Sequence, residues 1–259
     1  MRTQKLTRYL QPLREGGSLP ALAEADDDFL YVVKFRGAGH GVRALVAELI
    51  GGEVVRALGL NVPELVFLEV DDAFGQAEAD EEIQDLLKAS RGLNLGLHFL
   101  SGAFSMDPYV NKADSLTASL IVWLDSYLTN VDRTARNTNL LQWHQKETWV
   151  IDHGASLIFH HSWSDPHEAA VKPFSFVRNH TLLTKASQLD EADRIAHERL
   201  TPDIIRDIVN LLPDEWLNAM ELELPPDRIR QVYYSFLTER LAGSRIFTEE
   251  AIKARHESI

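Results

Sequence analysis

Three polar residues near the middle of the chain have the types and the spacing needed to move a phosphate group. Asp132 and Asn137 lie on the segment TNVDRTARNTNLL (129–141), and Asp152 follows an apolar run in IDHG (151–154). A carboxylate can take the proton from an attacking hydroxyl group, and magnesium prefers carboxylate and amide oxygens together with phosphate oxygens and water. The pattern predicts that Asp132 is a catalytic base and that Asn137 and Asp152 are magnesium ligands.

Residues upstream can hold the phosphates of a nucleotide. Lys34 lies near the end of the run FLYVVKF (29–35), where its ammonium group would act as a point charge on phosphate oxygens. A carboxylate on the following helix must steady this lysine, and Glu48 and Glu53 are both candidates. Arg133 either takes a catalytic part or braces its loop by pairing with a nearby carboxylate, which is the role that we favour.

The Asp-x-x-x-x-Asn spacing and the later Asp-x-Gly element are those of the protein-kinase catalytic loop and its metal-binding element. In the kinase order, the glycine-rich loop over the phosphates comes before the lysine. Gly16, Gly17 and Ser18 are therefore the candidates for that loop. The glycines of RGAGHG (36–41) precede a helix and compete for the same role, but they follow the lysine, so we interpret them as a flexible connection.

The elements that must position these residues follow an α+β pattern, with strands first and helices after. Apolar and β-branched runs predict strands at 29–35, 61–71 and 93–104. Helical spacing predicts a helix from 42 to about Gly59, and the acidic stretch 71–92 is expected to be a loop. If the third strand ends in a hinge, backbone groups there would meet adenine at Leu100, Ser101 and Ala103.

The second part of the chain is predicted to be mainly helical. The segment 115–128 is long and almost entirely apolar, as in a buried helix. NLLQWH and TWVID are expected to form a hairpin, 153–182 an ordered loop, and the residues from Thr184 onward several helices broken at prolines. We therefore expect one two-lobed protein-kinase-like domain, with a small β-rich N-lobe (1–103) and a larger helical C-lobe (104–259).

Composition excludes several other classes of protein. The chain has 259 residues, a formal net charge of −13 and no cysteine, which argues against a nucleic-acid partner and excludes disulfides, thiol nucleophiles and cysteine-ligated metals. The polar N-terminus does not read as a signal peptide, and no stretch has the apolar length of a membrane span. A cytoplasmic location is the expectation. The regular spacing of a zinc site is missing from His153, His160, His161 and His167.

Four segments together resemble one known family. They are YVVKF (31–35), AELIGGEVVRALGLNVPE (47–64), NVDRTARNTNLL (130–141) and IDHGASL (151–157). In these segments the chain resembles the HipA-like kinases, a bacterial branch of the protein-kinase-like fold with kinship to phosphatidylinositol kinases. The resemblance covers about half the chain, in the order that the family shows.

This resemblance implies ATP- and Mg²⁺-dependent phosphorylation of a Ser or Thr hydroxyl, with a protein as the expected acceptor. It implies the same roles for Asp132, Asn137 and Asp152 as the spacing does, with Lys34 on the phosphates, and it aligns Glu48 as the partner of Lys34. The chain departs from the family at Thr134, where many members have histidine, and it lacks the larger N-terminal region of the full-length toxins. Toxin activity is therefore not carried over.

Two alternatives stay open at the level of sequence. A pseudokinase would bind nucleotide or a protein partner without catalysis, although every predicted metal-binding residue is present. A lipid or small-molecule kinase would use the same residues and differ only in its acceptor.

Overall fold

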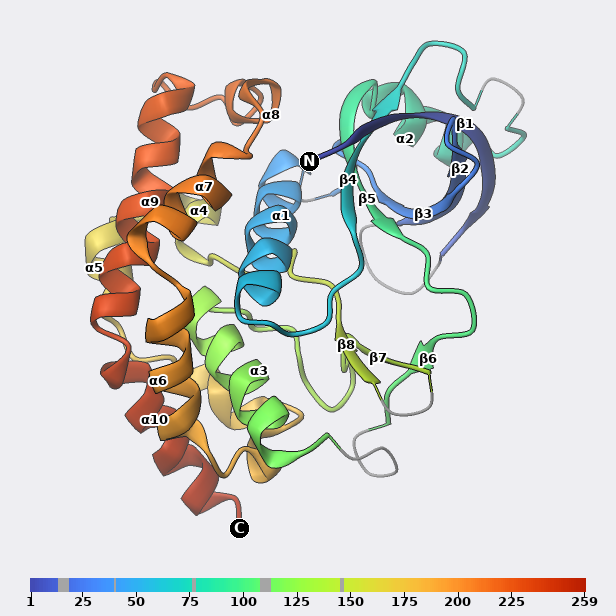
Figure 1. The fold of residues 1–259 in the computed structure, drawn as a ribbon. Coiled ribbons are helices and arrows are strands. Elements are labelled where there is room, and N and C mark those ends of the chain that lie inside the picture. Colours follow the sequence, from blue (N-terminus) through green and yellow to red (C-terminus); the bar gives the residue numbers. More distant parts are fainter. Residues whose placement is uncertain (14–18, 40, 76–77, 108–112, 145–146) are drawn as a thin grey trace.

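A closed barrel of five strands forms the first part of the fold (Figure 1). The computed structural model describes residues 1–13, 19–39, 41–75, 78–107, 113–144 and 147–259. The barrel strands are β1 (Thr3–Pro12), β2 (Ala21–Ala25), β3 (Leu30–Lys34), β4 (Leu65–Val70) and β5 (Gly92–His98). They follow the order β1–β2–β3–β5–β4, and a parallel pairing of β1 with β4 closes the ring.

The strands predicted at 29–35, 61–71 and 93–104 are confirmed as β3, β4 and β5, but β1 and β2 were not predicted. In β1 only Leu6 is buried, so the strand shows no hydrophobic alternation. In β2 the buried positions are alanines, which fit a narrow barrel interior but are weak strand formers.

The acidic stretch 71–92 was predicted to be a loop, and this is wrong because it contains the helix α2 (Glu81–Ala89). Asp80 caps the helix by accepting hydrogen bonds from the backbone N–H groups of Glu82 and Ile83. Acidic residues in the first turn favour a helix because they interact well with the helix dipole. Leu87 is the buried residue of α2.

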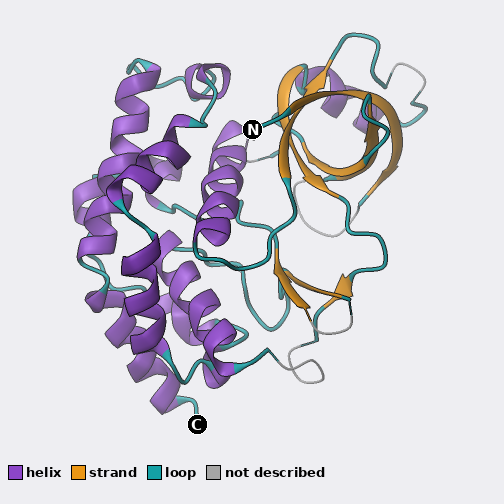
Figure 2. Cartoon of the chain, in the orientation of Figure 1, coloured by secondary structure: helices purple, strands orange, loops and turns teal. Residues whose placement is uncertain are grey.

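Helices dominate the rest of the chain and gather on the side of the molecule away from the barrel (Figure 2). The helix predicted at 115–128 is confirmed, and 11 of its residues are buried. No helix within the described ranges is both long enough and apolar enough to cross a bilayer. The longer helices and α8 are α1 (Gly41–Ala57), α3 (Ser115–Leu128), α6 (Leu189–Arg199), α7 (Pro202–Asn210), α8 (Asp214–Asn218), α9 (Pro226–Ala242) and α10 (Arg245–Glu257).

Two hydrophobic clusters hold these parts together. One fills the barrel, and the other joins α1 and α3 to the later helices and to outward-facing residues of β4 and β5. α1 therefore lies between the barrel and the helical part (Figure 1). This placement lets α1 carry side chains toward both.

The segment 153–182, predicted to be a loop, contains short helical turns instead. Asp165 caps one of them, and Pro166 occupies its first position, where a missing N–H costs nothing. The segment has no clear hydrophobic period, and the helix starts were therefore missed. Its turns are α4 (Phe159–Ser162), α5 (Pro166–Ala170) and the 3₁₀ helix η1 (Ser175–Asn179), and the 3₁₀ helix η2 (Leu183–Lys185) follows directly after it.

A second, three-stranded sheet follows the barrel, made of β6 (Phe104–Ser105), β7 (Leu140–Trp143) and β8 (Glu147–Val150). β7 and β8 form the antiparallel pair that the hairpin prediction required. β6 pairs with β7, so the chain leaving the barrel runs directly onto this sheet.

α8 fastens the helical part to one end of the barrel. β5 continues past the last residue of β3, and α8 supplies partners for the backbone of Leu93 there. Glu215 accepts the Leu93 N–H at 3.1 Å and also pairs with Arg36. The indole N–H of Trp216 donates to the Leu93 carbonyl at 2.7 Å, and its ring lies edge-on to Phe67 at 5.5 Å.

Candidate active site

The loop between α3 and β7 presents Asp132. The C-cap of α3, Thr129, has a left-handed backbone with φ of 56°, which turns the chain out of the helix. A tight turn follows, in which the Thr134 N–H donates to the carbonyls of Asp132 and Asn137, both at 2.9 Å. The loop is thus held by a buried helix at one end and a hairpin at the other, as predicted.

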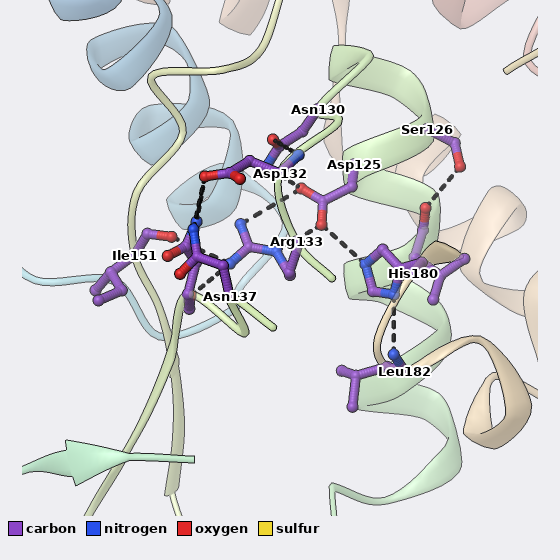
Figure 3. Close-up of polar contacts among 11 residues, drawn as sticks. Asp125, Ser126, Asn130, Asp132, Arg133, Asn137, Ile151, His180 and Leu182 are labelled. Carbon is purple, nitrogen blue, oxygen red and sulfur yellow. Dashed lines mark hydrogen bonds and ion pairs between the residues drawn. The ribbon is translucent and has the colours of Figure 1, made fainter. Parts of the chain in front are cut away.

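The amide of Asn137 is bonded to the carboxylate of Asp132 (Figure 3). Asn137 Nδ2 donates to Asp132 Oδ2 at 2.7 Å, and Asn139 Nδ2 donates to the same oxygen at 3.3 Å. Because both donors use Oδ2, Asp132 Oδ1 has no hydrogen bond to the described part of the chain. Asn137 uses its amide nitrogen in this bond, and its Oδ1 accepts no hydrogen bond from the described part of the chain.

Burial and the neighbouring charge of Asp152 raise the pKa of Asp132, although the amides of Asn139 and Asn137 oppose the rise. A carboxylate with a raised pKa is a stronger base, which is the property that proton abstraction needs. Backbone contact brings the two segments together, because the Ile151 N–H donates to the Asn139 carbonyl at 3.1 Å. The loop that carries Asp132 and the Asp-x-Gly element therefore meet at one place.

Lys34 joins the barrel to this place. Its ammonium group donates to Glu48 Oε2 at 2.8 Å and to Asp152 Oδ1 at 2.5 Å, so residues far apart in sequence share one cation. Burial disfavours the charged lysine, but the two carboxylates more than offset this and raise its pKa. Glu53 pairs instead with Arg56, so the structure places Glu48 and not Glu53 against the lysine.

Glu48 is fully buried and links α1 to the Asp-x-Gly element. Its Oε2 also accepts the backbone N–H of His153 at 2.6 Å. Burial would raise its pKa, but the charge of Lys34 and the contacts with His153 hold the pKa of Glu48 well below its usual range. Asp152 itself has a left-handed backbone, with φ of 58°, which turns its carboxylate toward the lysine.

Gly51 of α1 lets His153 approach the helix. A Cβ atom at this position would lie 2.4 Å from the His153 Cβ. We expect overpacking in Gly51→Ala to lower the free energy of unfolding by about 1 to 3 kcal/mol. The better helix preference of alanine stabilises by about 1 kcal/mol and offsets only part of this loss. Phosphate transfer should fall with it, because His153 adjoins Asp152.

Urea denaturation and phosphate-transfer rates of the Gly51→Ala variant test this expectation. Gly243→Ala is a matched control, because Gly243 has a negative φ and the nearest atom to its added Cβ is at 3.4 Å. Equal stability of the two variants would contradict the close contact with His153.

Arg133 is buried, and its guanidinium group bonds to α3 and to the backbone before β7 and after β8 (Figure 3). Its Nε donates to Asp125 Oδ2 at 2.5 Å, and its Nη1 donates to the carbonyls of Ile151, at 3.1 Å, and Asn139. A guanidinium group so enclosed by its own chain fits the bracing role, since it offers little surface to a substrate.

Asp125 is the buried counter-charge of this brace. Besides Arg133 it accepts from Asn130 Nδ2 at 3.0 Å and from His180 Nε2 at 2.9 Å. Burial disfavours its charge, but the charge of Arg133 and the bond from His180 hold the pKa of Asp125 far below its usual range.

We expect Asp125→Asn to lower the free energy of unfolding at pH 7 by about 3 to 5 kcal/mol, because Arg133 would remain buried without a counter-charge. The folded-state pKa is depressed, so the carboxylate stabilises the fold above its unfolded pKa of about 3.9 and loses this effect as the pH falls below it. The difference between wild type and variant should therefore shrink below about pH 4.

Chemical denaturation at several pH values measures this difference. Asp190→Asn, which removes a carboxylate that is 70% exposed, is the control and should change stability by less than about 0.5 kcal/mol. A loss for Asp125→Asn no larger than that of the control would contradict the role of Asp125.

The other predicted nucleotide contacts either form no hydrogen bond with this cluster in the described part of the chain or fall outside the described residues. Leu100, Ser101 and Ala103 connect β5 to β6, where the Ser101 carbonyl accepts the Trp143 indole N–H at 2.9 Å. The loop candidates Gly16, Gly17 and Ser18 fall outside the described residues. Of the competing glycines, Gly37 donates its N–H to Ser90 at 3.2 Å and so packs against the end of α2.

The sequence analysis did not find Asp125, Asn130, Asn139 or His180. One signal was available, because an aspartate inside an almost wholly apolar helix must have a buried partner. The others gave no pattern, since their partners come from distant parts of the chain.

Comparison with known proteins agrees with this geometry. A family model described as HipA-like kinase matches residues 6–240. The crystal structure of the Helicobacter pylori proinflammatory kinase CtkA is similar with a TM-score of 0.52 and 14% sequence identity, over 96% of this chain and 97% of that one. At this identity the similarity shows a shared fold. No curated protein sequence matches the chain significantly. Because the family model spans most of its length, the chain belongs to the HipA-like kinase family.

Proposed function

We propose that the protein transfers the terminal phosphate of ATP, with Mg²⁺, to a Ser or Thr hydroxyl of a protein acceptor. The single observation that carries this proposal is the meeting of Lys34, Glu48 and Asp152 beside the Asp132–Asn137 pair. One group of residues supplies charge for phosphates and the other supplies a base. Membership of a kinase family supports the reaction class, and ATP, Mg²⁺ and the acceptor are the proposed parts.

The donor atoms suit magnesium. A kinase site needs only one or two protein oxygens, because phosphate oxygens and water complete the shell. Asp152 offers a carboxylate and Asn137 an amide oxygen whose nitrogen is already used by Asp132. Bound there, Mg²⁺ would neutralise charge on the phosphate oxygens.

In the proposed reaction Asp132 Oδ1 takes the proton of the acceptor hydroxyl while the hydroxyl oxygen bonds to the γ-phosphorus of ATP. The bond from the γ-phosphorus to the bridging oxygen breaks, and ADP leaves. Lys34 stays charged throughout, because its raised pKa keeps it protonated, and it holds the phosphates in place.

We propose further that the barrel and the helical part act as two lobes, 1–103 and 104–259, with the nucleotide between them. Gly16, Gly17 and Ser18 would cover the phosphates, and Leu100, Ser101 and Ala103 would contact adenine. Lys34 on the barrel and Asp152 beyond β8 support this placement, since the nucleotide phosphates must reach both. A cytoplasmic location and the absence of a nucleic-acid partner are part of the same proposal.

Incubation of the protein with labelled ATP, Mg²⁺ and a lysate tests the function. We expect label on protein, released by acid hydrolysis as phosphoserine or phosphothreonine, and none with Asp132→Ala. Label on lipid or on a small molecule would overturn the proposed acceptor. Magnesium-dependent ATP binding without any transfer would overturn the proposed activity and favour a pseudokinase.

A further inference from the structure

A buried histidine outside the predicted motifs is bonded to the catalytic loop. We infer that His180 is a positioning residue that fixes the orientation of Asp132 through Asp125, so that the segment 175–183 and the catalytic loop act as one unit. The inference rests on the proposed function, because it concerns the base of that reaction.

His180 uses both ring nitrogens (Figure 3). Its Nδ1 accepts the backbone N–H of Leu182 at 3.0 Å, so the ring proton must sit on Nε2. Nε2 then donates to Asp125 Oδ2 at 2.9 Å. The side chain is 3% exposed, so water competes little for either bond.

From Asp125 two chains of hydrogen bonds lead to the base. In the shorter one, Asp125 Oδ1 accepts from Asn130 Nδ2 at 3.0 Å, and Asn130 Oδ1 accepts the backbone N–H of Asp132 at 3.1 Å. In the other, the Arg133 guanidinium donates to Asp125 and to the Asn139 carbonyl. The Asn139 side-chain amide then donates to the Asp132 carboxylate. The backbone and the carboxylate of Asp132 are therefore both held from Asp125.

The backbone joins the same two segments. The Thr181 N–H donates to the Arg133 carbonyl at 3.1 Å, and Thr134 and His180 form an isolated antiparallel bridge. This contact keeps the two segments adjacent even without the imidazole. Among the described residues, the His180 imidazole is the group of this segment that bonds to the Asp125 carboxylate, so it can set the orientation of that carboxylate.

Two substitutions separate the two bonds of the ring. In His180→Gln the side-chain amide nitrogen lies about as far from the backbone as Nε2 of the histidine does. It can therefore still donate to Asp125, but the bond from the Leu182 N–H is lost. In His180→Asn the shorter side chain can accept the Leu182 N–H as in an Asx turn, but it does not reach Asp125. A merely structural role would affect both variants to a similar degree.

The test measures phosphate transfer from Mg²⁺·ATP to the protein fraction of the lysate as ATP is varied, together with the melting temperature. We expect His180→Asn to lower the maximal rate about 10- to 100-fold with the KM for ATP unchanged, because a small misplacement of a base is costly. His180→Gln should retain most of the rate. Both variants should bind Mg²⁺·ATP in calorimetry as wild type does.

Equal rates for the two variants, or an order of activity that follows their melting temperatures, would overturn the inference. A change confined to the KM for ATP would overturn it as well, because positioning of the base acts on the maximal rate. Asp132→Ala separates this failure from failure of the proposed function. If Asp132→Ala stays active, the assignment of the base itself is wrong.

Discussion

Asp132→Asn should lower the maximal rate of phosphate transfer by about 10²- to 10⁴-fold, the range that a general base contributes. The amide has nearly the size of the carboxylate but cannot accept a proton at neutral pH. Binding of Mg²⁺·ATP should change by less than about twofold, because in the proposed reaction Asp132 Oδ1 contacts the acceptor and not the phosphates. Initial rates at saturating ATP and calorimetry with Mg²⁺·ATP measure the two quantities.

Asp227→Asn is the control for this variant, because its carboxylate is 94% exposed on α9. It should transfer phosphate at the wild-type rate. An Asp132→Asn protein that is folded and transfers at a similar rate would remove Asp132 from the reaction. A loss of ATP binding equal to the loss of rate would instead assign Asp132 to the nucleotide.

Asp152→Asn should weaken binding of Mg²⁺·ATP and reduce transfer by about 100-fold or more, since a metal ion supplies several kcal/mol of charge stabilisation. The substitution removes a negative charge from the metal site and leaves Lys34 with Glu48 as its partner. Titration of the rate with Mg²⁺ should show a higher requirement for the metal. This separates the variant from Asp132→Asn, whose magnesium dependence should stay as in wild type.

Calorimetry in the presence and absence of Mg²⁺ checks the assignment. Wild type should bind ATP far more tightly with the metal, and Asp152→Asn should lose most of this difference. A variant that keeps the full effect of magnesium would show that Asp152 is not a ligand, whatever its rate of transfer.

The residues that the sequence predicted share one property. Asp132, Asn137 and Asp152 lie close together in the chain, and their spacing is fixed by a turn and a hairpin that the same segment encodes. Lys34 and Glu48 lie on consecutive elements, which the predicted strand and helix placed in order. Local spacing and order were enough to single them out as candidates. The contact of Lys34 with Asp152, 118 positions apart, depends on the packing of the whole chain.

Asp125 and His180 lie outside the reach of that reasoning. They are 55 positions apart, and their contact depends on how the 175–183 segment folds back onto α3. The barrel shows the same limit, because β1 joins β4 through a parallel pairing of residues about 60 positions apart, such as Thr3 with Phe67. Such pairings follow from the packing of the whole chain, and no single segment encodes them.

The attachment of α8 to the barrel has a consequence for synthesis of the protein. The hydrogen bonds that join Leu93 with Glu215 and with Trp216 span 122 and 123 positions, and the pair of Arg36 with Glu215 spans 179. A nascent chain can build the barrel strands early, but the backbone of Leu93 and the ring of Phe67 wait for α8 to emerge from the ribosome. During that interval an apolar surface and unpaired strand groups are exposed to other chains. We therefore expect the nascent chain to be most prone to aggregation before α8 has been made.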